Sequence, residues 1–223
     1  MRVRPRVKVC CISSVAEAHL AVRHGADALG LVSAMPSGPG PIDEDLIAEI
    51  AASAPPPIAT FLLTSLLDAD QIIAQQRRCG ANTLQLVDAM PMVAYEKLRR
   101  ALPGIGLVQV IHVLGEQSVR EAAAIAPHVD ALLLDSGNPQ LAIKQLGGTG
   151  RVHDWTHSRR IVSECDKPVF LAGGLRANNV EAAVATVRPF GVDLCSGVRT
   201  DGRLDENKLA AFFAALALTG TPA

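Results

Sequence analysis

Carboxyl and thiol side chains stand at the ends of two apolar runs that are far apart in the chain. Asp135 follows three leucines, and Cys10 and Cys11 lie late in the first apolar run. Neighbouring residues of a strand point to opposite faces, so one of the two cysteines is expected to face inward. A thiol, with an ordinary pKa of about 8.5, becomes a useful base when its surroundings lower that value. A carboxyl and a thiol that flank one substrate suit proton transfer at two positions. The plainer alternatives are a turn aspartate and a small buried hydrophobe.

Glycines follow the last two apolar runs. Gly173 and Gly174 come after the run that ends at Ala172, and Ser196 and Gly197 come after the next one. Glycine lets backbone N–H groups approach a ligand closely, and successive N–H groups form a concave site for an anion. The alternative is that these glycines only turn the chain. Because the loops after the last two strands of a barrel often hold phosphate, the sequence predicts a phosphate site here.

Two further residues could meet an anionic group of a substrate. His112 ends an apolar run, and Arg199 follows Ser196 by three positions. A positive side chain beside a bound anion makes a charge-assisted hydrogen bond. The alternatives are a structural histidine and a solvated arginine. No lysine stands at the end of a predicted strand, which argues against Schiff-base chemistry. No cluster of Asp, Glu and His in the sequence indicates a metal site.

Eight strands, each followed by a helix, are predicted to position these residues. The strands are expected at 7–13, 28–33, 58–64, 83–87, 107–113, 131–135, 168–172 and 192–195, and the helices at 15–24, 43–53, 68–79, 92–102, 116–126, 157–165, 179–187 and 205–218. Ser14 and Asp43 are predicted N-caps, and Gly80 is expected to end the third helix. The strands lack alternation of apolar and polar residues, which is typical of a parallel sheet buried on both faces. The pattern predicts one α/β domain over 1–223, a (β/α)8 barrel with its site at the C-terminal ends of the strands.

Composition and charge exclude several classes of function. The 223 residues are 49% apolar with a formal net charge of −1, and no Lys/Arg run exceeds two residues. Nucleic-acid binding depends on clustered positive charge, so no nucleic-acid partner is expected. No apolar stretch approaches the roughly 20 residues of a membrane span, so no membrane partner is expected. Five cysteines without a C-x-x-C pair disfavour a disulfide framework or structural zinc, and a cytoplasmic location is predicted.

Five motifs make the chain resemble the phosphoribosylanthranilate isomerase family of tryptophan biosynthesis, from Val7 to about Phe213. Two of them lie on the predicted first and sixth strands, and three lie in the C-terminal third. They are VKVCCIS at 7–13, similar to K-I-C-G-I-T; LLLDS at 132–136; GGTGRVHDW at 147–155, similar to G-G-T-G-x-x-F-D-W; FLAGGLRANNV at 170–180, similar to L-x-G-G-L-x-x-x-N-V; and GVDLCSGV at 191–198, similar to G-V-D-V-S-S-G-V.

The resemblance implies an Amadori rearrangement of an N-(5-phosphoribosyl) amine. Asp135 would be the general acid that protonates the furanose ring oxygen, and Cys10 would be the thiolate that removes a proton from the second carbon of the sugar. Gly173, Gly174, Ser196 and Gly197 would hold the phosphate. Asp193 matches a family residue near the substrate. No cofactor is expected, because the imine formed on ring opening serves as the electron sink.

Three departures from the family pattern concern the amine-bearing part of the substrate. The family usually has S-P-R after the second strand, with an arginine that meets the anthranilate carboxylate, whereas Gly40 stands at that position here. Q-L-H-G after the fourth strand is replaced by the stretch that ends in Val87 and Asp88. Arg199 stands where the family commonly has an acidic residue. Arg199 or His112 could supply the missing positive charge.

Other readings remain open at this point. The amine could differ from anthranilate while the reaction stays the same. The chain could also be a phosphosugar-binding barrel without turnover, although such a binder would not need both Cys10 and Asp135. A transferase resembling thiamine phosphate synthase would need magnesium-binding carboxylates, for which only Asp135 and Asp193 are placed. A small phosphoribosyl compound is the expected partner, and the chain is expected to be a monomer or a homodimer.

Overall fold

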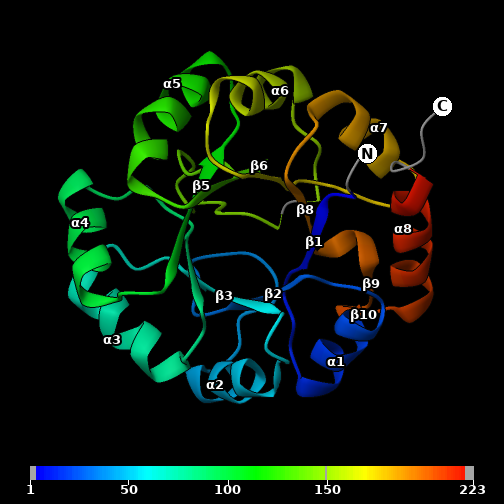
Figure 1. Cartoon of the computed structure of the whole chain (residues 1–223), viewed down its shortest axis with the longest axis horizontal. Helices are drawn as coiled ribbons and strands as arrows, with labels where there is room; N and C mark the ends of the chain where they lie inside the picture. The colour runs from blue at the N-terminus through cyan, green and yellow to red at the C-terminus, as the bar shows by residue number, and fades with distance from the viewer. Residues whose placement is uncertain (1–3, 149, 219–223) are drawn as a thin grey trace.

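Eight parallel strands close into a barrel in the computed structural model, which describes residues 4–148 and 150–218 (Figure 1). Each strand pairs with its neighbours in chain order, and β1 pairs with β8 to close the ring. The strands are β1 (Arg6–Val9), β2 (Ala28–Val32), β3 (Ala59–Thr64), β4 (Thr83–Leu86), β5 (Gly106–His112), β6 (Ala131–Asp135), β7 (Val169–Leu171) and β8 (Gly191–Leu194). The predicted (β/α)8 barrel is thereby confirmed.

A ring of helices surrounds the strands, as Figure 1 shows from one end of the barrel. The helices are α1 (Val15–Arg23), α2 (Glu44–Ser53), α3 (Ala69–Cys79), α4 (Met92–Ala101), α5 (Glu116–Ile125), α6 (Trp155–Glu164), α7 (Val180–Val187) and α8 (Glu206–Leu218). Ser14 accepts a hydrogen bond from the backbone N–H of Glu17 and so caps α1. Gly80 ends α3 in the left-handed conformation. Asp43 precedes α2, but its side chain makes no cap hydrogen bond.

Two apolar layers hold the barrel together. The larger layer lies between strands and helices, where residues such as Ile47, Ile72 and Leu209 are fully buried. The smaller layer fills the inside of the barrel and includes Phe61 and Phe170, whose rings meet edge to face at 5.9 Å. Aliphatic side chains buried on both faces explain why the strands read as continuous apolar runs.

The first strand is shorter than predicted, because the backbone turns sharply after Cys10. Cys11 has a φ of 61°, a left-handed conformation that a strand cannot contain. β1 therefore ends at Val9 rather than at residue 13. Beyond β8 the chain forms the short helix η2 (Ser196–Val198) and a hairpin that the sequence did not predict, β9 (Arg199–Thr200) and β10 (Arg203–Leu204). Among the described residues, no helix is both long and apolar enough to span a membrane.

Candidate active site

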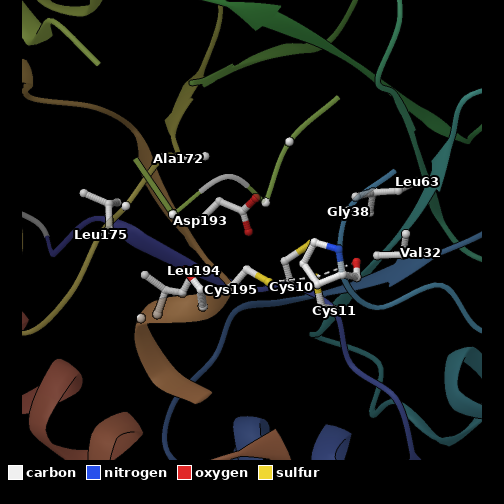
Figure 2. Close-up of a pocket in the computed structure, with 18 of the residues that line it drawn as sticks. Cys10, Cys11, Val32, Gly38, Leu63, Ala172, Leu175, Asp193, Leu194 and Cys195 are labelled. Atoms are coloured by element: carbon white, nitrogen blue, oxygen red, sulfur yellow. Dashed lines mark hydrogen bonds between the residues drawn. The ribbon is translucent and has the colours of Figure 1, made fainter. Parts of the chain in front are cut away.

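A pocket opens at the C-terminal ends of the strands, where barrel enzymes carry their sites. It encloses about 640 Å³ including its open mouth. Figure 2 shows that Cys10, Cys11, Asp193 and Cys195 gather at its floor, while Leu63 and Val32 lie to one side. The wall is completed by glycines of three loops, which are Gly147, Gly148, Gly150, Gly173, Gly174 and Gly197. The pocket therefore unites a reactive thiol, a carboxyl group and exposed backbone.

Cys10 is one of the two cysteines whose side chain was expected to face inward, and it lies against Gly30 of β2. A Cβ atom at Gly30 would stand 2.7 Å from the Cys10 sulfur and 3.0 Å from Lys8 Nζ. Lys8 and Cys10 are two positions apart, so both point to the inside of the barrel. The missing side chain of Gly30 is what leaves room for both of them.

Lys8 is a site residue that the sequence analysis did not identify. Its ammonium group donates a hydrogen bond to Asp193 at 2.9 Å, and its side chain is fully buried. The ammonium also lies 5.3 Å from the centre of the Phe61 ring. Burial by itself would lower the pKa of Lys8, but the charges of Asp193 and Cys10 outweigh that effect and raise it. Lys8 therefore stays positively charged. Its spacing from Cys10 was the signal that could have revealed it.

The surroundings of Cys10 favour its thiolate. The neighbouring thiol of Cys11 favours the thiolate of Cys10, and together with the charge of Lys8 this outweighs burial and lowers the pKa of Cys10 to about 6. The pKa of Asp193 is raised instead, because burial disfavours its charged form more strongly than Lys8 favours it. At neutral pH the site thus contains a sulfur base beside a buried cation.

Asp135 ends β6 across the barrel mouth from Cys10. It is 8% exposed, and one of its oxygens accepts a hydrogen bond from the backbone N–H of Ser136 at 2.7 Å. A Cβ atom at Gly147 would lie 2.7 Å from the other oxygen, so this carboxylate lies directly behind the loop that lines the pocket. The charge of Asp135 raises the pKa of Asp193. The structure thus brings Asp135, Asp193 and Cys10 to the same end of the barrel.

The four residues of the expected phosphate site lie together in the pocket wall. Gly173 and Gly174 have φ values of 88° and 64°, which favour glycine. A Cβ atom at Gly197 would stand only 2.0 Å from the carbonyl oxygen of Leu175, so the two loops approach too closely for any side chain there. These loops present backbone and the hydroxyl-bearing Ser196 to the pocket, as an anion site requires.

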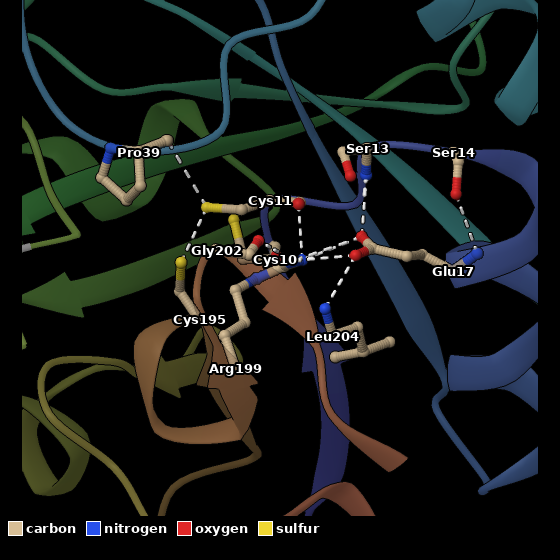
Figure 3. A network of polar contacts seen from close by, with 10 residues as sticks. All are labelled: Cys10, Cys11, Ser13, Ser14, Glu17, Pro39, Cys195, Arg199, Gly202 and Leu204. Carbon is tan, nitrogen blue, oxygen red and sulfur yellow. Dashed lines mark hydrogen bonds and ion pairs between the residues drawn. The ribbon is translucent and has the colours of Figure 1, made fainter.

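Arg199, which was expected to meet an anionic substrate group, is not among the described residues that line the pocket. Its guanidinium pairs with Glu17 at 3.1 Å and donates to the carbonyl oxygens of Cys10 and Cys11 at 3.1 and 2.5 Å (Figure 3). Its side chain is only 7% exposed. The positive charge is therefore balanced by Glu17, and Arg199 supports the turn that carries the two cysteines.

His112 also lies outside this pocket. One ring nitrogen contacts the carbonyl oxygen of Val87 at 3.0 Å, and the ring borders a separate small cavity lined also by Asp88 and Glu121. Contact between His112 and the substrate stays a prediction, and the structure places the ring at this second cavity. Its place at the end of β5 turns it toward the fourth strand, where a backbone carbonyl holds it.

Gly40 and Cys11, two positions at which the chain departs from the family motifs, are in contact. A Cβ atom at Gly40 would lie 2.6 Å from Cys11 Cβ and 3.0 Å from its sulfur. An arginine at position 40 therefore does not fit beside Cys11. Among the described residues that line the pocket, none is Arg or Lys. The side of the pocket near Gly40 is instead apolar, with Val32, Met35 and Leu63.

Comparisons with known proteins agree with this arrangement. The family model described as N-(5'phosphoribosyl)anthranilate (PRA) isomerase matches residues 7–215. N-(5'-phosphoribosyl)anthranilate isomerase 2 of Methanosarcina mazei is 38% identical over 93% of this chain and 92% of its own length. The isomerase of Haloferax volcanii is 36% identical over 96% of this chain and 93% of its own length.

A solved structure shares the architecture as well. The phosphoribosyl anthranilate isomerase of Thermotoga maritima superposes with a TM-score of 0.82 and 26% identity, covering 96% of this chain and 98% of that one. Fold, sequence and the placement of the motifs point the same way. The chain belongs to the phosphoribosylanthranilate isomerase family.

Proposed function

We propose that this chain isomerises N-(5-phosphoribosyl)anthranilate to 1-(2-carboxyphenylamino)-1-deoxyribulose 5-phosphate, a step of tryptophan biosynthesis. The observation that carries the proposal is Cys10, a thiol whose pKa is lowered to about 6, on the floor of a pocket walled by glycine loops. Family membership supports the same reaction. The substrate is a small phosphoribosyl compound, and the five free cysteines suit a reducing cytoplasm.

The phosphate is the anchor of the substrate. In this proposal, backbone N–H groups of Gly173, Gly174 and Gly197, together with Ser196, hold it at the ends of β7 and β8. Fixing one end of the sugar phosphate places its ring over Cys10, and such positioning supplies a large part of the barrier reduction in many enzymes. The close approach of the loops at Gly197 supports this role, since it leaves backbone as the surface that meets the ligand.

Asp135 is the proposed general acid. It donates a proton to the furanose ring oxygen as the bond from that oxygen to the first carbon breaks, and the nitrogen lone pair forms an imine with that carbon. The position of Asp135 supports the role, because this buried carboxyl group ends β6 at the same end of the barrel as Cys10 and lies behind the loop at Gly147 that lines the pocket.

Cys10 is the proposed general base. Its thiolate removes the proton from the second carbon, and the electrons move into the imine to give an enolamine. The enolamine then takes up a proton at the first carbon while the hydroxyl group on the second carbon loses one, and the second carbon becomes the ketone. Lys8 holds the sulfur in its charged form between proton transfers, because its ammonium lies in the same space that Gly30 leaves open. The imine is the electron sink, so no cofactor takes part in the proposed steps.

A second candidate is the same rearrangement on a phosphoribosyl amine other than anthranilate. The observation that favours it is the contact between Gly40 and Cys11, which excludes an arginine at position 40. The apolar side chains of Val32, Met35 and Leu63 next to it suit an uncharged ring. Both candidates share the proposed acid, base and phosphate site and differ only in the amine.

Turnover of phosphoribosylanthranilate made in situ, followed by loss of its fluorescence, tests the proposal. The wild-type chain is expected to consume it, and Cys10→Ser and Asp135→Asn are each expected to slow turnover at least about 100-fold. Folded protein that binds ribose 5-phosphate but leaves the compound intact would favour the second candidate. Full activity in either variant would remove that residue from the proposed mechanism.

A further inference from the structure

Two cysteines from opposite ends of the chain meet inside the pocket. The sulfur of Cys195 lies 2.8 Å from the sulfur of Cys11 (Figure 3). A disulfide bond has a length of about 2.05 Å, so the two sulfurs are already within an ångström of bonding distance. Cys11 is buried and Cys195 is partly exposed to the pocket, which lets a small reagent reach Cys195 first.

Both cysteines stand where the family motifs have other residues. Cys11 replaces the glycine of K-I-C-G-I-T, and Cys195 replaces a serine of G-V-D-V-S-S-G-V. Cys11 also keeps the left-handed φ of 61° that suits the glycine, and a side chain in that conformation is uncommon. Backbone strain of this kind gathers at functional sites. Two departures 184 positions apart therefore combine into one sulfur pair.

We propose that Cys11 and Cys195 form a reversible dithiol–disulfide site within the pocket, which a low-molecular-weight disulfide such as oxidised glutathione closes. The thiolate of Cys195 attacks the small disulfide, whose sulfur–sulfur bond breaks to give a mixed disulfide and one free thiol. The sulfur of Cys11 then displaces the second small thiol and forms the Cys11–Cys195 bond. The protein loses two electrons and two protons, and the small disulfide is reduced to two thiols.

Closure of this bond alters the base and the pocket wall. The Cys11 thiol favours the thiolate of the neighbouring Cys10 and donates a hydrogen bond to the carbonyl oxygen of Pro39 at 3.6 Å. The disulfide has no thiol proton, so Cys10 loses the neighbouring thiol that favours its thiolate and Pro39 loses its hydrogen bond. The oxidised protein is therefore the less active form. This consequence for turnover rests on the proposed function, whereas the bond itself does not.

Counting thiols in denatured protein after treatment with oxidised glutathione tests the bond without any activity assay. The wild-type chain is expected to fall from five thiols to three, and dithiothreitol should restore all five. Cys10→Ser, which lacks the base, should still lose two thiols. Cys195→Ser should lose none. Cys165→Ser, altered at the end of α6 and away from the pocket, is the matched control and should lose two.

Turnover and peptide mapping complete the test. The oxidised wild-type chain should lose at least tenfold in turnover and regain it with dithiothreitol, while Cys195→Ser should change less than twofold on the same treatment. Mapping should find residues 11 and 195 linked in Cys10→Ser. The proposal would be overturned if the treated wild-type chain kept all five thiols. It would also be overturned if Cys10→Ser lost no thiols on treatment, since Cys10 would then take part in the bond. If a cysteine other than Cys11 bonds to Cys195, the Cys11→Gly variant will still lose two thiols, and that result would contradict the proposed pair.

Discussion

Lys8, Cys10 and Asp193 form a buried chain of charges in which each group sets the state of the next. From the residues alone, either Cys10 or Cys11 was expected to face inward, and the resemblance of VKVCCIS to the family motif singled out Cys10. Lys8 was not identified, because its sequence position at the start of a strand looks unremarkable and its partner is 185 residues away. Arg199 was expected near the substrate because it follows the proposed phosphate loop, and its partner Glu17, 182 residues away, left no signal in the sequence. Partners across the barrel are not readable from one sequence.

Lys8→Met should raise the pKa of Cys10, because it removes the cation that favours the thiolate. The base must be deprotonated, so the acid limb of kcat/KM, expected near pH 6, should move to higher pH and the rate at pH 7 should fall. At pH 7, kcat/KM should fall about tenfold for each pH unit by which the pKa of Cys10 rises above 7. A pH–rate profile measures this.

Lys97→Met is the matched control for that experiment. Lys97 makes an ion pair on the outer surface with Asp70, whose side chain is 72% exposed. Its removal should leave the pH profile where it is. An unchanged acid limb in a folded Lys8→Met protein would show that Lys8 does not set the ionisation of Cys10.

Gly40→Arg should place a side chain against Cys11, because even a Cβ atom at position 40 would lie 2.6 Å from Cys11 Cβ. We expect the single variant to lose stability and turnover. The double variant Cys11→Gly/Gly40→Arg removes the obstacle and adds a cation, and its KM for phosphoribosylanthranilate should fall by about tenfold relative to wild type. Thermal unfolding and steady-state kinetics of wild type, Gly40→Arg and the double variant measure both effects. A double variant no better than the single one would contradict the steric account.

At the scale of elements, the order and type of every strand and helix in the barrel followed from the sequence, while several ends did not. Runs of β-branched residues and leucine mark strands buried on both faces, and β6 (Ala131–Asp135) begins and ends as predicted. β1 ends four residues before the predicted end at residue 13, because Cys11 adopts a left-handed conformation. A cysteine in the sequence does not predict that conformation. The hairpin β9–β10 has strands of two residues each, too short to leave a pattern.

Gly197→Ala should disturb the proposed phosphate site through the loop that faces it. Its Cβ atom would stand 2.0 Å from the carbonyl oxygen of Leu175, so the loops after β7 and β8 must separate. We expect KM to rise at least about tenfold with a smaller change in kcat, because phosphate binding positions the substrate.

Gly106→Ala provides the comparison, because a Cβ atom there would make an ordinary contact with Thr83 at 3.4 Å. Gly106 begins β5 at the opposite end of the barrel from the site. Kinetics with both variants separate a local effect on the site from a general effect of added methyl groups. Equal KM values for Gly197→Ala and wild type would argue against a phosphate site at these loops.

At the scale of the whole molecule, contacts between the first and last parts of the chain complete the barrel. β1 pairs with β8 over four residue pairs, and Glu17 of α1 accepts hydrogen bonds from Arg199 and from the backbone N–H of Leu204. The closed barrel was predictable from the count of strand–helix units. This polar junction was not, because its members are charged residues with no motif of their own.

Glu17→Gln should weaken that junction most at neutral pH. Burial would raise the pKa of Glu17, but hydrogen bonds from Leu204 and Arg199 outweigh it and lower the pKa. A carboxylate with a lowered pKa stabilises the fold above its unfolded pKa of about 4.3 and loses that contribution as the pH falls through the folded value. We expect a loss of roughly 1 to 3 kcal/mol in the free energy of unfolding at pH 7.

Urea unfolding of Glu17→Gln and wild type at a series of pH values measures this difference, which should shrink as the pH falls below 4.3 or so. Glu181→Gln, on the outer helix α7, is a control whose stability should follow wild type. A gap between Glu17→Gln and wild type that stays constant down to acid pH would assign the loss to packing rather than to charge.

The buried ion pair between Lys8 and Asp193 has a consequence for the order in which the site forms during synthesis of the chain. The cation is delivered by β1 near the start, but the carboxylate that holds it belongs to β8, near the end. A nascent chain without its last strand carries the sulfur and the ammonium group with no partner to fix them. The buried ion pair of the site is therefore completed only after residue 193 has been synthesised and β8 has paired with β1.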